Sequence, residues 1–209
     1  MKPFDRRAIA AFLCFTATLA QASSLAVLVQ DGAGKALADT VVYAEQGGLV
    51  AQKSPKGAII EQRGLKFLPL VSVVQAGATV SFPNNDKVRH HIYSFSPAKK
   101  FDQKLYSGAA ASTQVFDKAG TVVLGCNIHD RMIAYVKVVD TPFFARTDAD
   151  GVARIELPAG KYTLSAWHFN QVAGAAAEQQ VTVKQGEAAT AASYKLAVKA
   201  VAEGEGAGY

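Results

Sequence analysis

The sequence predicts an all-β protein made of two β-sandwiches. Short runs rich in Val, Ile, Phe, Tyr and Thr alternate with turn residues along most of the 209 residues, which is the pattern of sandwich proteins. No stretch sustains the residue spacing of an amphipathic helix. Half of the residues are hydrophobic and 19% are charged, so the chain has enough apolar surface to bury a core and is not of the disordered class.

The expected strands follow one another from residue 25 onward. Each is a run of β-branched, aromatic or aliphatic residues, and turn residues separate the runs; Asp31-Gly32-Ala33-Gly34 ends the first and Pro142 precedes the tenth. Residues 173–177 are expected to be a loop or a short helical turn, and the Gly- and Glu-rich residues 200–209 a flexible tail. The expected strands are residues 25–30, 41–44, 58–62, 70–75, 79–82, 90–95, 114–116, 121–125, 133–139, 143–147, 153–157, 162–168, 179–184 and 193–198.

The first 22 residues have the parts of a secretory signal peptide: an early basic segment, an apolar run over residues 8–20, and a small-x-small cleavage site at residues 20–22. The apolar run is shorter than the roughly 20 residues that span a bilayer. We therefore expect a periplasmic protein that does not span the membrane once the signal is removed. Cys14 leaves with the signal, so Cys126 is the single cysteine of the mature chain.

The charge balance argues against one class of partner. Lysine and arginine number 22 against 17 acidic residues, a formal net charge of +5. This excess is mild and its basic residues are scattered, so we expect no nucleic-acid partner.

Metal-binding side chains gather between two expected strands. Cys126, His129 and Met132 follow one another at the spacing Cys-x2-His-x2-Met, and His90 begins a strand about 36 residues upstream. A sandwich can bring that histidine beside the loop. One thiolate, two imidazoles and a weak thioether are the ligand set of a blue-copper centre.

Other uses of these residues stay open. Zinc prefers four strong ligands and gives Met132 no role, and Cys126 could be a buried structural cysteine among unrelated histidines. A catalytic pair of Cys126 and His129 would lack an orienting residue, so we expect no enzyme. His91 competes with His90, but strand alternation sends the two to opposite faces and the register with Asn84 favours His90.

Residues 80–86, His90 and the loop with Cys126 resemble the plastocyanin/amicyanin branch of the cupredoxins. The strings at residues 89–97 and 125–130 are similar to the cupredoxin-containing methylamine-utilisation proteins of the L type. The resemblance implies a cupredoxin Greek-key sandwich. It also implies one type 1 copper ion, with His90, Cys126 and His129 as equatorial ligands and Met132 as the axial ligand.

The chain departs from those relatives around the ligands. They have Pro before the upstream histidine and Asn after it, where this chain has Arg89 and His91, so a residue that braces the ligand loop in the relatives is missing. Asp130 and Arg131, with Lys87 and Arg89 opposite, replace an apolar docking patch. They are either solvated loop tips or a basic rim that steers an acidic redox partner.

A second resemblance lies outside this region. Residues 25–42, and later residues 147–162, resemble the two halves of a carboxypeptidase-regulatory-like, transthyretin-like sandwich. We therefore expect residues 23–47 and 141–199 to form one discontinuous sandwich, with the cupredoxin domain, residues 52–140, inserted in it. In the alternative, residues 23–47 supply the first strands of the cupredoxin. Contacts of Val27 or Val29 with Ile155 or Leu164 distinguish the two.

The sequence leaves three functions open. The first is a periplasmic type 1 copper protein that carries single electrons between redox partners. The second is a copper sequestration or delivery module without redox duty. The third is a structural β-sandwich protein with a vestigial site, although such a site would be expected to have lost one of its ligand types.

Overall fold

The computed structural model describes residues 23–47, 55–107, 112–172, 176–186 and 189–199. The predicted signal peptide and the predicted tail lie outside these residues. The described chain is all-β and contains no helix, which confirms the predicted fold class. Accordingly, these residues include no helical segment with the length and apolar character needed to cross a membrane.

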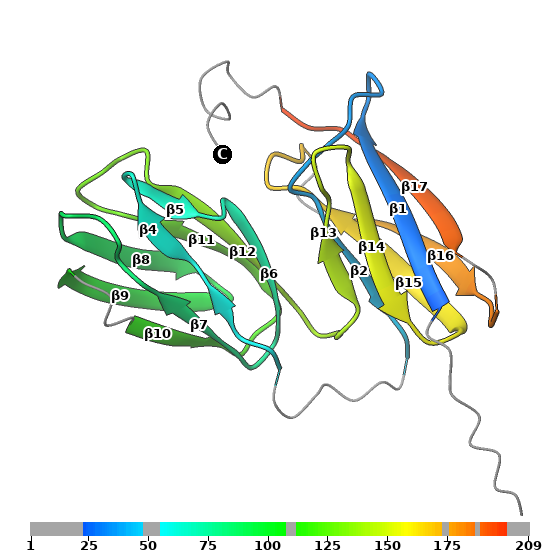
Figure 1. Ribbon diagram of the computed structural model, residues 1–209, viewed down its shortest axis with the longest axis horizontal. Coiled ribbons are helices and arrows are strands. Elements are labelled where there is room, and N and C mark those ends of the chain that lie inside the picture. The colour runs from blue at the N-terminus through cyan, green and yellow to red at the C-terminus, as the bar shows by residue number, and fades with distance from the viewer. Residues whose placement is uncertain (1–22, 48–54, 108–111, 173–175, 187–188, 200–209) are drawn as a thin grey trace, which may run out of the picture.

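One group of strands forms a two-layered sandwich from both ends of the described chain (Figure 1). A sheet of order β14-β1-β17 packs on a sheet of order β13-β2-β15-β16. We call this group the terminal unit. Its strands are β1 (Ser23–Asp31), β2 (Val41–Glu45), β13 (Phe144–Arg146), β14 (Val152–Leu157), β15 (Gly160–Trp167), β16 (Ala177–Val183) and β17 (Thr190–Leu196).

β1 is the central strand of its three-stranded sheet, and buried and partly exposed side chains alternate along it. Leu25, Val27 and Val29 are fully buried while the residues between them are partly exposed, so one face of the strand points into the core. The strand pairs antiparallel with β14, where Leu25 lies opposite Ile155, and parallel with β17. Its three buried side chains share one apolar cluster with Ile155 and Leu164.

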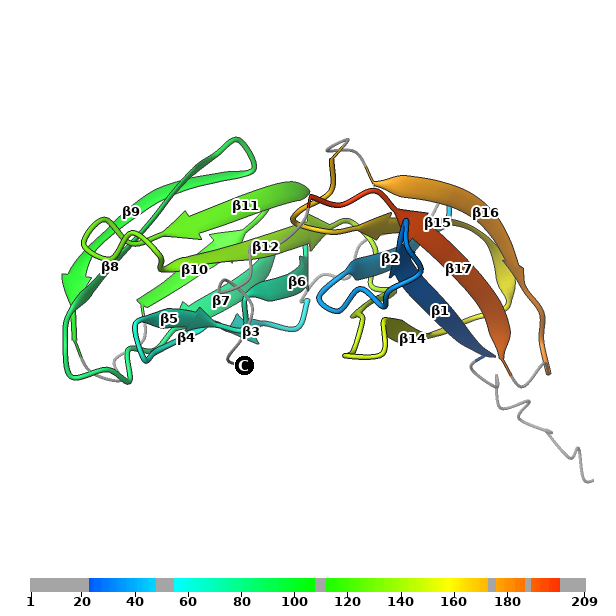
Figure 2. The same ribbon diagram turned by 90° about the horizontal axis from the view of Figure 1, so that it is seen from above.

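The second group, which we call the central unit, lies beside the first (Figure 2). A sheet of order β6-β12-β11-β8-β9 packs on a sheet of order β10-β7-β3, and the hairpin of β4 and β5 lies next to β7. Its strands are β3 (Ala58–Ile59), β4 (Glu61–Arg63), β5 (Lys66–Leu68), β6 (Val71–Gln75), β7 (Ala78–Phe82), β8 (His90–Ser96), β9 (Lys99–Tyr106), β10 (Ser112–Phe116), β11 (Gly120–Gly125) and β12 (Ile133–Val139).

The strands differ from the predicted ones in three places. The sequence did not predict β5 and β9, and the run predicted over residues 58–62 is divided into β3 and β4 around Ile60. Ile60 is fully buried, and its N–H donates to the carbonyl of Ser81. The chain therefore continues along β7 through this break.

The two units touch through a small apolar cluster of their own. Val71 of the central unit is fully buried against Val41 and Trp167 of the terminal unit. The ring of Tyr135 stacks on Phe169 at a centroid distance of 4.9 Å. Because stacked aromatic rings contribute beyond their buried area, this contact helps to hold the units side by side.

Candidate metal centre

The loop between β11 and β12 is short and closed by its own backbone. The N–H of Met132 donates to the carbonyl of His129 at 2.9 Å, and the N–H of Cys126 donates to the carbonyl of Met132 at 3.2 Å. Cys126 follows the last residue of β11, and Met132 precedes the first residue of β12. The sheet therefore fixes both ends of the segment that carries the predicted ligands.

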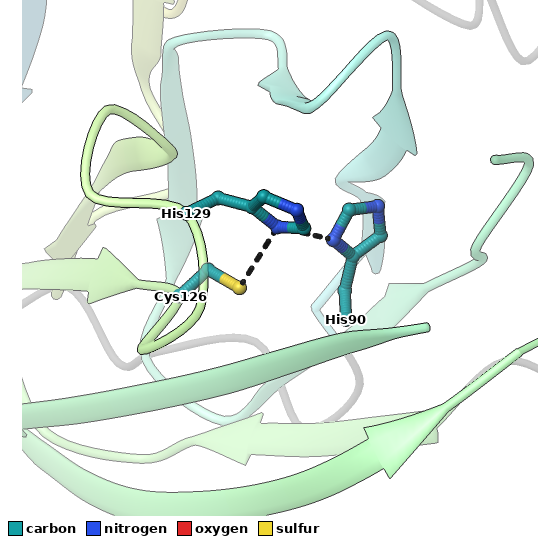
Figure 3. Close-up of side chains that lie close together, drawn as sticks. All are labelled: His90, Cys126 and His129. Carbon is teal, nitrogen blue, oxygen red and sulfur yellow. Dashed lines mark hydrogen bonds between the residues drawn. The ribbon is translucent and has the colours of Figure 1, made fainter. Parts of the chain in front are cut away.

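His90, the first residue of β8, meets this loop (Figure 3). Its Nδ1 lies 3.2 Å from Nδ1 of His129, and the Sγ of Cys126 lies 3.7 Å from the same His129 atom. All three donor atoms lie within 4.8 Å of one another. His90 and Cys126 are buried, at 0% and 4% exposure, whereas His129 is half-buried.

These spacings suit a common metal ion. Bonds of about 2.0 Å from nitrogen and about 2.3 Å from sulfur, at trigonal or tetrahedral angles, place the donor atoms about 3.3–3.8 Å apart. The distances from His129 to His90 and to Cys126 fall at or close to that range, and the donor atoms of His90 and Cys126 lie within 4.8 Å of each other. His90, Cys126 and His129 thus form a group that is close enough to hold one metal ion.

Met132 lies at the end of the same loop and is 1% exposed. It belongs to the core cluster of the central unit together with Cys126, and the two residues line one surface hollow. Met132 thus lies in the same core cluster and hollow as Cys126.

His91 lies outside the three-donor group. Its Nε2 contacts the carboxylate of Asp102 on β9, and its ring lies 5.8 Å from that of Tyr93. The side chains of the two neighbouring histidines thus lie on different faces of β8, as expected because successive side chains of a strand alternate.

The sequence did not indicate that Asp86 lies beside the candidate ligands. Its Oδ2 lies 2.8 Å from Nε2 of His90, and the carboxylate also accepts the N–H groups of Gly64 and Leu65, at 2.7 Å and 3.0 Å. Burial raises the pKa of Asp86, but the hydrogen bonds from Leu65, His90 and Gly64 outweigh it, so this pKa lies below its usual value. Asp86 lies four residues before His90 in the sequence, and this short separation was the feature that could have indicated a contact between them.

Asn84 braces the segment that leads to His90. Its side-chain Nδ2 donates to the carbonyls of Val88 and Tyr106, at 2.9 Å and 3.0 Å, and its Oδ1 accepts the N–H of Asp86 at 3.0 Å. Asn84 is 2% exposed. This buried amide holds the ligand segment from its start.

The surface around the site is polar and carries more positive than negative side chains. Lys87 and Arg89 are exposed before His90, and Asp130 and Arg131 are exposed after His129. Ile128, at 49% exposure, adds one apolar side chain to the loop tip.

Comparison with known proteins gives structural likenesses only. No protein-family model matches the chain, and no curated protein matches it. A purple cupredoxin from Nitrosopumilus maritimus is 23% identical, with a TM-score of 0.35, over 40% of this chain and 99% of its own. An oxidised amicyanin variant is 18% identical, with a TM-score of 0.37, over 46% and 99% of the two chains.

A third solved structure shares a similar portion of the fold. The copper-containing nitrite reductase from Thermus scotoductus is 23% identical, with a TM-score of 0.39, over 47% of this chain and 25% of its own. All three matches cover less than half of this chain. The choice of metal therefore has to be argued from the side chains of His90, Cys126 and His129.

Proposed function

We propose that this chain is a type 1 copper protein that carries single electrons between redox partners. The observation that carries the proposal is the set of two imidazole nitrogens and one sulfur within 4.8 Å of one another, in which His90 and Cys126 are buried and His129 is half-buried. Thiolate suits Cu(I), imidazole suits Cu(II), and the mixed set serves both oxidation states. His90, Cys126 and His129 would hold the ion, with Met132 as a weak fourth ligand, and bound copper would supply one-electron chemistry.

The chain's own residues would keep the ligands in place during the redox cycle. The loop is tied at Cys126 and Met132 by backbone hydrogen bonds, and His90 is held by Asp86. Ligands that do not move between oxidation states need little reorganisation. His129, the most exposed of the three donors, is the residue through which we expect electrons to pass to a docked protein.

Copper is favoured over zinc by the composition of the donor set. Within the described residues the group holds three strong donors, and three do not complete a structural zinc site. The thioether of Met132 has a use in blue-copper centres, where a long axial bond tunes the potential. Because all four candidate ligands are retained, a vestigial site is the weaker candidate.

The experiment that tests the metal is addition of Cu(II) to the purified mature protein, followed by its visible spectrum. An intense cysteine-to-copper absorption is expected in the parent and not in Cys126→Ser. A parent without that absorption would overturn the blue-copper assignment. Reversible voltammetry with slow copper loss to a chelator supports electron carriage, whereas fast loss supports delivery.

The partner we propose is an acidic redox protein. Lys87, Arg89 and Arg131 outnumber Asp130 on the exposed rim, and long-range attraction of this kind weakens in salt because counterions screen it. The rate of electron transfer to the physiological partner should therefore fall as ionic strength rises. An unchanged rate would exclude steering by this rim.

We also infer how the chain is divided and where it works. Residues 52–140 would be the cupredoxin-like domain, inserted between residues 23–47 and 141–199 of the other sandwich. The pairing of β1 with β14 and β17 supports this division. A periplasmic location rests on the signal-like first 22 residues, and sequencing the N-terminus of protein from a periplasmic extract tests it, with Ser23 expected as the first residue.

A further inference from the structure

We propose that Asp86 is the positioning residue of the site: its carboxylate holds the proton of His90 on Nε2, which leaves Nδ1 as the metal-binding atom. The metal-binding half of this statement rests on the function proposed above. The proton placement does not, because it concerns the metal-free protein as well.

The contacts of the His90 ring determine the tautomer. Nε2 lies 2.8 Å from Oδ2 of Asp86, whereas Nδ1 lies 3.2 Å from Nδ1 of His129 (Figure 3). An ionised carboxylate only accepts hydrogen bonds, so Nε2 must carry the hydrogen. In a neutral imidazole the other nitrogen then keeps its lone pair, and that nitrogen is the one that lies among the donors.

Asp86 is itself fixed in place from a different part of the chain. It accepts the N–H groups of Gly64 and Leu65, the two residues between β4 and β5. Because both carboxylate oxygens are engaged by these N–H groups, the carboxylate cannot turn away from His90 without losing bonds. The hairpin of β4 and β5 thus acts as a support for a ligand that belongs to β8.

The backbone of this turn has an unusual shape for its sequence. Gly64 has a φ of 63° and Leu65 a φ of 59°, and a leucine with positive φ is uncommon because its Cβ crowds the backbone. Leu65 is 49% exposed, so burial of its side chain does not account for the conformation. A two-residue hairpin turn requires positive φ at both central residues, and the bonds from both N–H groups to Asp86 help to stabilise the leucine in that conformation.

A neighbouring pair provides an internal comparison. Asp102 contacts His91 as Asp86 contacts His90, but His91 lies outside the donor group. Removal of either carboxylate deletes one negative charge beside a histidine of β8. Only removal of the Asp86 carboxylate should alter the metal site.

The carboxylate would also tune the bound metal. A carboxylate that accepts the second N–H of a ligand histidine makes the ring a stronger donor, and loss of such partners typically weakens metal binding by about 10- to 100-fold. The added negative charge favours Cu(II) over Cu(I). Asp86 should therefore lower the reduction potential of the centre.

The test compares Asp86→Ala and Asp86→Asn with Asp102→Asn in the mature chain. In the metal-free protein, nitrogen NMR should show His90 protonated at Nε2 in the parent and in Asp102→Asn, and a shift toward Nδ1 protonation in Asp86→Ala. With copper added, both Asp86 variants should bind Cu(II) about 10- to 100-fold more weakly and have a higher reduction potential.

Two outcomes would overturn the proposal. One is an unchanged His90 tautomer in Asp86→Ala. The other is a loss of Cu(II) affinity in Asp102→Asn equal to that in the Asp86 variants. If Asp86→Ala fails to fold, the same comparison is made in a Leu65→Gly background, which removes the need to stabilise the turn. If the parent binds no Cu(II), the proposed function fails while the tautomer measurement still decides the role of Asp86.

Discussion

At the scale of single residues, the two adjacent histidines of β8 have separate duties. His90 is fully buried among the donors, and His91, whose side chain is 14% exposed, contacts Asp102. The proximity of His90 to Cys126 could be expected from sequence because the Cys-x2-His-x2-Met spacing marks a loop and strand alternation separates the histidines. The contribution of Asp86 could not, since an aspartate in a turn has many possible partners and its own depend on the distant turn at Gly64.

A first prediction follows from the different positions of these histidines. His90→Ala should reduce Cu(II) affinity by more than the about 10- to 100-fold that loss of an outer partner causes, because a donor atom is lost. His91→Ala should leave the affinity within a few fold of the parent. Competition with a chelator measures both, and equal losses would contradict the assignment of His90.

Two tyrosines with raised pKa values predict how the free energy of unfolding changes with pH in the alkaline range. Burial raises the pKa of Tyr106 and of Tyr194 to about 12, and each hydroxyl donates to a backbone carbonyl, of Phe82 and Leu164 respectively. An unfolded tyrosine loses its proton near pH 10. The free energy of unfolding should therefore be intact below about pH 10 and fall between about pH 10 and about pH 12, since only the unfolded chain releases the protons there.

Tyr106→Phe isolates this effect. The hydroxyl also accepts a hydrogen bond from Nε2 of Gln62 at 2.5 Å. The variant should therefore be less stable near neutral pH by about 1–3 kcal/mol, the usual net value of two hydrogen bonds, yet lose less stability across the alkaline range. Urea unfolding followed at several pH values tests it. A parallel fall in the parent and the variant would show that Tyr106 is not the group involved.

At the scale of elements, the packing of β11 against β8 requires a residue without a side chain. Gly125, the last residue of β11, lies opposite Tyr93 of β8. A Cβ on Gly125 would lie 2.8 Å from Cζ and 2.9 Å from the hydroxyl oxygen of Tyr93. The glycine before Cys126 therefore makes room for a ring that covers the end of the strand beside the ligand.

Gly125→Ala tests this fit. We expect a destabilisation of about 1–3 kcal/mol, the range for overpacking, because the ring of Tyr93 must move. In the double variant with Tyr93→Ala the additional cost of the alanine should disappear. Unfolding curves of the four proteins give the coupling, and additive effects would mean that the two residues do not compete for space.

One strand, β9, could not be predicted from the sequence. β9 was not predicted, because Lys99, Lys100, Asp102 and Lys104 interrupt its apolar residues. It is an edge strand beside β8, where lysines are common since they discourage pairing with another chain. An edge strand exposes much of both faces, so it lacks the apolar pattern that identified β11 and β12.

At the scale of the whole molecule, the all-β class was predictable because it follows from the pattern of the entire chain. The contact between the units was not, since it depends on single rings whose partners are far away in sequence. Tyr135 is stacked on Phe169, and Nζ of Lys137 lies 5.5 Å above the ring of Trp167. These contacts predict that the two units support each other during unfolding.

Phe169→Ala should weaken that support with little effect on either core, because Phe169 is only partly buried and packs at the junction. Calorimetry should show the heat absorption of the parent separating into two transitions in the variant. Val172→Ala, at a site that is 59% exposed, is the control. Identical traces for the parent and both variants would show that the units unfold independently of this contact.

The direction of β12 has a consequence for how the molecule could be attached. The strand begins at the end of the central unit that faces away from the terminal unit and runs toward it (Figure 2). The terminal unit can thus serve as a handle while the opposite end stays accessible. Tethering the copper-loaded protein to an electrode through Lys161→Cys, an exposed position of β15 in the terminal unit, should leave a soluble electron acceptor free to reach His129.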